Sequence, residues 1–165
     1  MARKNTVSTN PPQKEVTGRS RGLRLERTKP LFRPIETRPD VIVRSVIIVD
    51  DSHAVRKALR EFFTAAGDFF VCGEAENGRD AIEKAQRLHP DLIVTDLAMP
   101  VMNGFEEARL LKQLIPTVPV IIYTVNSSPS LEKEARLAGA SAVVSKSEVT
   151  TLIATARILA NKVAA

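Results

Sequence analysis

Five polar residues that could do chemistry lie at the ends of short apolar runs. They are Asp50, Asp51, Asp96, Thr124 and Lys146. Carboxylates within several ångströms of one another repel, which raises their pKa values unless a cation is present. A hard divalent ion with oxygen ligands suits such a group, and Mg²⁺ that keeps some of its waters is the usual choice. The residue types therefore indicate a Mg²⁺ site.

Asp96 is the candidate nucleophile of this group. Attack of its carboxylate on phosphorus would make an acyl phosphate, and Mg²⁺ and Lys146 would neutralise charge on the phosphoryl oxygens. Thr124 could donate a hydrogen bond to one of those oxygens. A helix that begins after Ser52 would point its N-terminus toward the site and add a modest favourable field.

These residues need a scaffold that brings them together, and the sequence from Ser45 onward predicts one. Strands are expected over residues 46–49, 69–75, 92–95, 120–123 and 142–145, each short and largely apolar. Apolar residues at helical spacing fill the intervals between them. Strands that alternate with helices require parallel pairing and right-handed crossovers.

Capping residues mark the ends of the predicted helices. Good N-cap residues precede four of them: Ser52, Asn103, Ser128 and Ser147. Glu106 follows Asn103 at the spacing of a capping box, and Gly67 and Gly139 are expected to end two helices. The third helix is expected to bury Ala108, Leu111, Leu114 and Ile115. The last helix has the cleanest amphipathic stripe.

The expected fold class is α/β, with a doubly wound five-stranded parallel sheet of flavodoxin-like order 2-1-3-4-5 and helices on both faces. In a parallel sheet the carboxyl ends of the strands lie on one edge. In this order strands one, three, four and five are neighbours, and the switch point lies between strands one and three. The five polar residues are therefore expected to share one crevice.

Composition separates the chain into a basic N-terminal segment and a globular part. Residues 1–45 contain eleven Lys and Arg against four Asp and Glu, a net charge of +7, whereas residues 46–165 carry −2. Five of the ten prolines also lie in the first 45 residues. We expect residues 1–44 to form a disordered tail and residues 45–165 to form one domain. The alternatives for the tail are a basic arm that contacts an acidic partner and a start site placed too early.

The same composition excludes other classes of protein. No apolar run approaches the roughly 18 residues of a membrane span, and no apolar stretch of a secretory signal follows the basic N-terminus. The single cysteine, Cys72, allows no disulfide within the chain, which suits a reducing compartment. We therefore expect a cytoplasmic protein. Because the high isoelectric point belongs to the tail, it does not by itself indicate a nucleic-acid binder.

The sequence from about residue 45 to residue 163 resembles a response-regulator receiver domain of two-component signalling. The motifs that carry the resemblance are VDDS at 49–52, DLIVTDLAMPVMNG at 91–104, IYT at 122–124 and GASAVVSK at 139–146. The resemblance implies that Asp96 is the phosphoacceptor for a histidine kinase, Thr124 the switch hydroxyl and Lys146 the phosphate-binding lysine. The Mg²⁺ ligands that it implies are Asp50, Asp51, Asp96 and the main-chain carbonyl of Ala98.

Four features depart from the family pattern. Val143 stands where the family often has an aromatic residue, Val125 where a small residue commonly follows the switch hydroxyl, and Ser147 where Pro or Asp commonly follows the lysine. The fifth strand is most similar to receivers that carry a helix-turn-helix output domain, yet the chain ends just after the fifth helix. The first two departures affect the expected switching geometry, and the last indicates a stand-alone receiver.

The leading hypothesis is a single-domain response regulator that is phosphorylated on Asp96 and signals by phosphorylation-dependent contact with a protein. Its expected partners are a histidine kinase or phosphotransfer protein and a downstream target, and a homodimer through the last two helices is an option. No membrane span is expected.

Two hypotheses of other classes stand beside it. A nucleic-acid-associated regulator would use the basic residues 1–45, and its binding would fall steeply with salt. A phosphatase would use Asp96 as nucleophile, but such enzymes usually place a general acid two residues further on, where this chain has Ala98. The chain is thus expected not to be an enzyme beyond its own phosphorylation and dephosphorylation.

Overall fold

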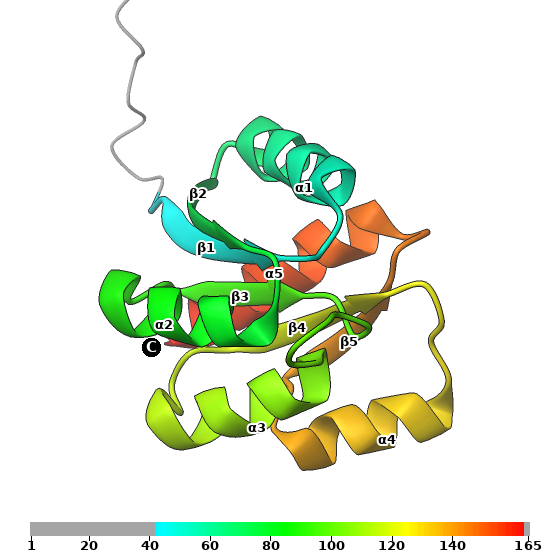
Figure 1. Ribbon diagram of the computed structural model, residues 1–165. Helices are drawn as coiled ribbons and strands as arrows, with labels where there is room; N and C mark the ends of the chain where they lie inside the picture. The colour runs from blue at the N-terminus through cyan, green and yellow to red at the C-terminus, as the bar shows by residue number, and fades with distance from the viewer. Residues whose placement is uncertain (1–41, 164–165) are drawn as a thin grey trace, which may run out of the picture. The chain divides into compact units, whose positions relative to one another are not determined.

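The computed structural model describes residues 42–163 (Figure 1). Five strands alternate with five helices along this part of the chain. The strands are β1 (Arg44–Val49), β2 (Phe69–Ala75), β3 (Leu92–Thr95), β4 (Val120–Thr124) and β5 (Ala142–Ser145). The helices are α1 (His53–Ala66), α2 (Gly78–Leu88), α3 (Gly104–Leu114), α4 (Pro129–Ala138) and α5 (Val149–Val163). The predicted alternation of strands and helices is confirmed.

All five strands form one parallel sheet in the order β2-β1-β3-β4-β5, which confirms the predicted flavodoxin-like order. Val49 lies opposite Thr95 where β1 pairs with β3, and Thr124 lies opposite Ser145 where β4 pairs with β5. Neighbouring strands therefore end at nearly the same level. The residues that follow them meet at one edge of the sheet.

Successive strand residues point to opposite faces of the sheet, and each face has its own apolar core. Val46 and Ile48 of β1 pack with residues of α1 and α5, whereas Ile47 and Val49 pack with residues of α2, α3 and α4. Figure 1 shows the same division, with α1 and α5 on one side of the sheet and the other three helices on the opposite side. Burial on both faces explains why the strands are nearly continuous apolar runs.

Three of the four predicted N-caps are confirmed. The Ser52 side chain accepts a hydrogen bond from the N–H of Val55, and the Ser128 side chain accepts one from the N–H of Leu131. Asn103 forms the predicted capping box with Glu106 at the start of α3. The predicted helix ends are confirmed as well: Gly67 and Gly139 close α1 and α4 with φ of 80° and 100°.

Two predicted element starts are wrong. β1 begins at Arg44, two residues earlier than expected, and the N–H of Ser45 donates to the Asp91 carboxylate at 2.7 Å. That polar contact with the segment before β3 is not visible in an apolar pattern. α5 begins at Val149, and the Ser147 hydroxyl lies 2.8 Å from the hydroxyl of Ser145 instead of capping the helix.

The buried face of α3 also differs from the predicted one. Ala108 and Leu111 are fully buried as expected, but Leu114 is 49% exposed. A carboxyl side chain, that of Glu107, is buried on this face instead. Glu107 lies four positions before Leu111, so both side chains fall on the same stripe of the helix.

Almost all of the predicted tail, residues 1–44, lies outside the described residues. Its disorder, the boundary at residue 44 and the alternative role in nucleic-acid binding therefore stay predictions. Within residues 42–163, no helix has the length and apolar character needed to cross a membrane.

The start of α3 lies very close to the end of β3. A Cβ at Gly104 would overlap the main-chain oxygen of Asp96 and would lie 3.2 Å from the Cα of Leu97. The N–H of Gly104 also donates to the carbonyl oxygen of Leu97 at 3.0 Å. Only glycine allows this close approach of two backbone segments.

We predict that Gly104→Ala lowers the free energy of unfolding by about 3 kcal/mol, because the added methyl group must push the backbone of Asp96 away. Urea denaturation measures the loss. Gly67→Ala is the control, since its Cβ would meet open space and only its φ of 80° is unfavourable, at a cost of about 1 kcal/mol. Equal losses in the two variants would contradict the close approach.

The buried carboxyl group of Glu107 makes stability depend on pH. Burial raises its pKa from 4.5 to about 8, although the hydrogen bond with Thr95 opposes the shift. Between these two values the folded protein keeps a proton that the unfolded chain releases, so the free energy of unfolding falls as the pH rises.

We predict a decline on the order of 1 kcal/mol per pH unit between about pH 5 and pH 8, reduced in Glu107→Gln because the amide does not ionise. Urea denaturation of both proteins across this window measures the two slopes. Parallel curves would mean that Glu107 ionises in the folded protein as it does in the unfolded chain.

Candidate functional site

The predicted site residues lie at the carboxyl edge of the sheet. Asp50 follows β1, Asp96 follows β3, Thr124 ends β4 and Lys146 follows β5. Asp50, Asp96 and Thr124 are 1%, 7% and 6% exposed, so three polar side chains are almost fully buried at this edge. The N–H of Asp96 donates to the carbonyl oxygen of Val49 at 2.8 Å, which carries the pairing of β1 with β3 into the site.

The ammonium group of Lys146 joins the two buried aspartates. Its Nζ lies 2.6 Å from Oδ2 of Asp50 and 3.0 Å from Oδ1 of Asp96. Burial alone would lower the pKa of Lys146, but the hydrogen bonds and charges of the two carboxylates outweigh this effect and raise the pKa. Lys146 therefore stays charged and supplies the cation that two buried carboxylates require.

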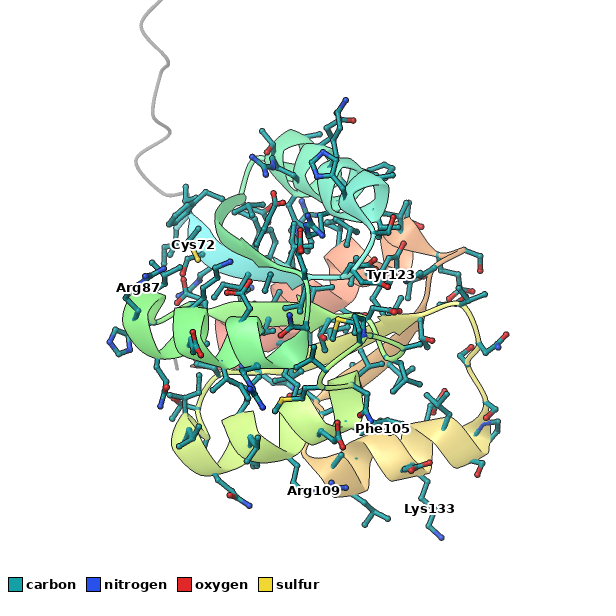
Figure 2. All side chains as sticks on the ribbon, viewed as in Figure 1. Cys72, Arg87, Phe105, Arg109, Tyr123 and Lys133 are labelled. Carbon is teal, nitrogen blue, oxygen red and sulfur yellow. The ribbon has the colours of Figure 1, made fainter. Side chains whose placement is uncertain are left out.

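Hydrogen bonds to its main chain fix Lys146 beside Thr124. The N–H of Lys146 donates to the carbonyl oxygen of Thr124 at 2.8 Å, and the Tyr123 hydroxyl donates to the carbonyl oxygen of Lys146 at 3.1 Å. Figure 2 labels Tyr123, which packs in the core under α1 and α5. Burial raises the pKa of Tyr123, although the charge of Lys146 opposes the shift. Because the chain has one tyrosine and no tryptophan, Tyr123 fluorescence reports on this site.

Two loops complete the site. The N–H of Ser52 donates to Oδ1 of Asp50 at 2.9 Å, and the N–H of Ala98 donates to Oδ2 of Asp96 at 3.1 Å. Each buried carboxylate thus has one oxygen on a main-chain N–H and the other on Lys146. Asp51 and Ala98 are exposed.

The oxygen atoms of this edge suit a hard divalent cation, because carboxylate and carbonyl oxygens are the protein ligands that Mg²⁺ takes. They are not grouped as a ready-made metal site: the described part of the chain holds no set of three His, Cys, Asp or Glu side chains arranged for a metal. Lys146 offsets only one of the two negative charges of Asp50 and Asp96 and binds an oxygen of each, so a metal ion would compete with it for these oxygens.

Arg56 is a residue of the site that the sequence analysis missed. It is 6% exposed, and it donates to the carbonyl oxygen of Asp50 at 2.8 Å. The same guanidinium group pairs with Glu74 at 3.3 Å and with Glu76 at 3.0 Å. It therefore ties the loop after β1 to the end of β2. The available signal was its position, since residue 56 shares the buried stripe of α1 with Leu59 and Phe63.

Glu107 was missed for a similar reason. Its side chain is fully buried, and its Oε2 lies 2.7 Å from the hydroxyl of Thr95, the residue before Asp96. In the sequence it precedes Ala108 on a stripe that helical spacing assigns to the core. A charged residue type at such a position is a signal of a buried polar contact.

Apolar side chains are exposed in the two loops that follow β3 and β4. Val101 is 71% exposed and Val125 is 73% exposed. Val101 also has φ of 69°, in the left-handed region that a β-branched residue rarely adopts. The departure at Val125 thus places an apolar side chain in solvent directly after Thr124.

Comparison with known proteins agrees with this geometry. The family model described as the response regulator receiver domain matches residues 46–157. The chemotaxis protein CheY of Thermotoga maritima is 37% identical over 97 residues, which cover 59% of this chain and 80% of that protein. A protein-glutamate methylesterase/protein-glutamine glutaminase of Methanosarcina acetivorans is 39% identical over 104 residues, which cover 62% of this chain but only 30% of that enzyme.

Solved structures show the same fold. The response regulator domain of CheB from Thermotoga maritima is 29% identical, with a TM-score of 0.68, and the match covers 72% of this chain and 97% of that one. A two-component response regulator of the LuxR family from Aurantimonas sp. SI85-9A1 is 28% identical, with a TM-score of 0.67, over 72% of this chain and 86% of that one. The chain therefore belongs to the response regulator receiver domain family, the phosphoacceptor domains of two-component signalling.

Proposed function

We propose that Asp96 is the phosphorylated residue, that a histidine kinase or a phosphotransfer protein is the donor, and that Mg²⁺ takes part. The observation that carries this proposal is the meeting of Asp50, Asp96 and Lys146 from the ends of three separate strands. Receiver domains bind Mg²⁺. The ligands that we assign to it are Asp50, Asp51, Asp96 and the main-chain carbonyl of Ala98.

In the proposed reaction one carboxylate oxygen of Asp96 attacks the phosphorus of a phosphohistidine. A P–O bond forms and the P–N bond breaks. The departing nitrogen of the histidine keeps the electron pair of the broken bond. The other nitrogen of the ring already carries a proton, so the histidine leaves as a neutral imidazole. Bound Mg²⁺ would supply positive charge to the phosphoryl oxygens. Lys146 turns from Asp50 toward the phosphoryl group, and the Thr124 hydroxyl donates a hydrogen bond to it.

The proposed activity of the chain is limited to its own phosphorylation and dephosphorylation. Hydrolysis of an external ester needs a proton donor for the leaving group, and the residue two positions after the nucleophile is Ala98. A cytoplasmic location, which is typical of receiver domains, belongs to this proposal.

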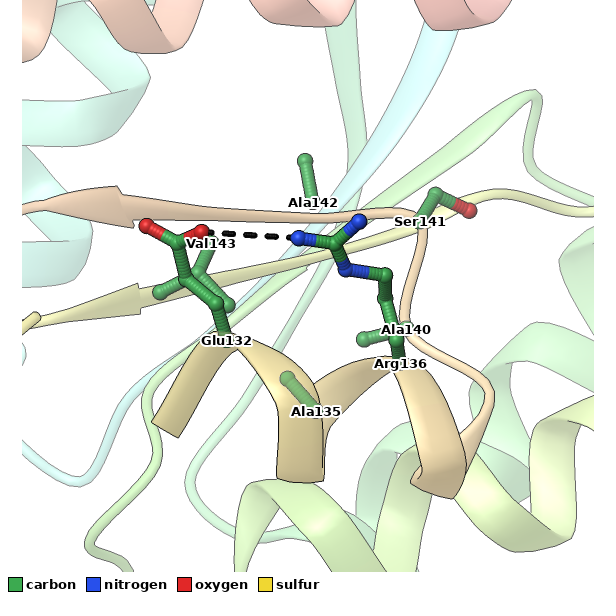
Figure 3. Close-up of a pocket in the computed structure, with 7 residues that line it drawn as sticks. All are labelled: Glu132, Ala135, Arg136, Ala140, Ser141, Ala142 and Val143. Atoms are coloured by element: carbon green, nitrogen blue, oxygen red, sulfur yellow. Dashed lines mark ion pairs between the residues drawn. The ribbon is translucent and has the colours of Figure 1, made fainter. Parts of the chain in front are cut away.

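The proposed output face is formed by α4, β5 and α5. A hollow of about 230 Å³ lies between α4 and β5 (Figure 3), and its lining includes Ala135, Ala140, Ala142 and Val143. Glu132 and Arg136 reach from α4 toward β5 and form an ion pair at 3.6 Å. Val143 is smaller than the aromatic residue common at this position, which leaves the hollow open.

The two helices of this face also expose apolar side chains. Leu137 of α4 is 79% exposed and Ile158 of α5 is 59% exposed, and they offer apolar surface to a target or to a second copy of the chain.

Phosphorylation of Asp96 is tested with the small phosphodonor acetyl phosphate. We predict that the protein gains one phosphoryl group in the presence of Mg²⁺ and none when the metal is chelated, and that Asp96→Asn gains none. Intact-protein mass spectrometry detects the group. The bond should break in alkali, because hydroxide attacks the carbonyl carbon of an acyl phosphate, and it should survive a brief treatment with acid.

Asp80→Asn is the control, since Asp80 pairs with Lys84 on α2 and its replacement removes the same charge outside the site. This variant should be phosphorylated to the same extent as the protein without a substitution. A label that persists in Asp96→Asn would overturn the assignment of Asp96.

The Arg56 contacts generate a prediction about the metal. Arg56→Lys keeps the positive charge but loses the planar fork that reaches Asp50, Glu74 and Glu76 together. We predict that its Mg²⁺ affinity falls about tenfold, as when an outer partner of a metal ligand is removed. Titration of Tyr123 fluorescence with Mg²⁺ measures the Kd.

Arg60→Lys is the matched control, because Arg60 lies one turn further along α1 and pairs with Glu74 from a side chain that is 57% exposed. Its Mg²⁺ affinity should be unchanged. If the two variants bind Mg²⁺ equally well, Arg56 does not hold the metal site.

A further inference from the structure

Glu107 carries a carboxyl group that the proposed phosphoryl transfer does not use. Its side chain is 0% exposed, and its Cβ lies 2.9 Å from the point where a Cβ of Gly78 would stand. One oxygen, Oε2, lies 2.7 Å from the Thr95 hydroxyl. The other, Oε1, has no hydrogen-bond partner within the part of the chain that the structure describes. Burying a carboxyl group with a single hydrogen-bond partner costs free energy. The geometry of its one hydrogen bond, to Thr95, indicates how this cost is reduced.

The Thr95 hydroxyl lies between two oxygen atoms but has one proton. It is 2.7 Å from Oε2 of Glu107 and 3.1 Å from the main-chain oxygen of Asp96. If Glu107 is ionised, its Oε2 and the main-chain oxygen of Asp96 can only accept hydrogen bonds, and the Thr95 hydroxyl can donate to only one of them. If Glu107 is neutral, its O–H donates to Thr95, and the Thr95 hydroxyl donates to the carbonyl oxygen of Asp96. Both short contacts are then hydrogen bonds.

The surroundings favour the neutral acid. Burial raises the pKa of Glu107 to about 8, even though the Thr95 hydroxyl would donate to Oε2 of the ionised form and lower the pKa. With the proton on Oε2, the unpartnered Oε1 is a neutral carbonyl oxygen, which costs less to bury than a charged carboxylate. With Glu107 neutral, the hydrogen bonds run from Glu107 to Thr95 and from Thr95 to Asp96.

The carbonyl group that receives this chain of hydrogen bonds belongs to the phosphoacceptor. The Asp96 oxygen lies against Gly104 at the start of α3, and the N–H of Asp96 is held by Val49. The peptide groups on both sides of the Asp96 side chain are thus fixed, one by β1 and the other by Thr95. A shift of this carbonyl would turn the Asp96 carboxylate relative to Lys146.

We propose that Glu107 is a positioning residue for phosphorylation: as a neutral acid it turns the Thr95 hydroxyl onto the main-chain carbonyl of Asp96 and fixes the direction of the Asp96 carboxylate. The proposal rests on Asp96 as the phosphoacceptor. Glu107 and Thr95 act through the main chain of Asp96 and not through its carboxylate.

Four variants test the proposal. Glu107→Gln keeps a donor for Thr95, whereas Glu107→Met has similar length and no donor. Thr95→Ser keeps the hydroxyl, whereas Thr95→Val has the same shape without it. The rate of phosphorylation by acetyl phosphate at saturating Mg²⁺ is measured for each, together with the Mg²⁺ Kd from Tyr123 fluorescence and the stability in urea.

We expect the rates to divide the variants into two pairs. Glu107→Gln and Thr95→Ser, which keep the donor and the hydroxyl, should react within about twofold of the unmodified chain. Glu107→Met and Thr95→Val should react about tenfold more slowly, the usual loss when an outer partner of a site residue is removed. The double variant Glu107→Met/Thr95→Val should be no slower than either single variant, because the two residues act through one chain of hydrogen bonds.

If Glu107 had a purely structural role, its variants would change the stability in urea but not the rate of phosphorylation. Glu107→Met removes a buried acid, so we expect it to fold at least as stably as the unmodified chain, and a slower reaction in this variant cannot come from unfolding. Equal rates in all four variants, with phosphorylation still dependent on Asp96, would overturn the proposal for Glu107 alone. Phosphorylation that persists in Asp96→Asn would instead overturn the proposed function.

Discussion

The interaction on which the site depends is the contact of one ammonium group with two buried carboxylates. Lys146 reaches Asp50 at 2.6 Å and Asp96 at 3.0 Å, and it thereby links the ends of β1, β3 and β5. Two carboxylates that are 1% and 7% exposed would repel each other strongly without a cation. The parallel sheet solves this problem geometrically, because its strand order brings a lysine from the fifth strand to the switch point between the first and the third.

Two further residues with ionisable side chains, Arg56 and Glu107, hold the backbone around these carboxylates. They lie on opposite faces of the sheet. Arg56 of α1 binds the carbonyl oxygen of Asp50, and Glu107 of α3 reaches the carbonyl oxygen of Asp96 through Thr95. Both are buried where a helix would normally present an apolar side chain. The helices therefore do more than cover the sheet: each one fixes the main chain that carries an aspartate of the site.

The fold could be predicted from the sequence because its signals are local. Apolar runs marked the strands, and Ser52, Asn103 and Gly139 marked helix ends whose hydrogen bonds involve residues nearby in the chain. The polar residues at the strand ends could be placed together once the strand order was assumed. The contacts of Arg56 and Glu107 could not be predicted, because charged residues are normally exposed and the partners of these two lie outside their own helices. Leu114, the last residue of α3, lies on the same stripe as Glu107 and Leu111 and yet is 49% exposed, which helical spacing alone could not predict.

Lys146 also explains how a change at the site can reach the rest of the domain. Two of the three N–H donors of its Nζ bind Asp50 and Asp96, and in the proposed reaction Lys146 turns from Asp50 toward the phosphoryl group on Asp96. Its N–H is bonded to the carbonyl oxygen of Thr124, and its own carbonyl oxygen accepts the Tyr123 hydroxyl. A displacement of Lys146 therefore acts directly on the ends of β4 and β5. These strands lead into α4 and α5, so the proposed reaction would couple a local change in charge to the face that those helices form.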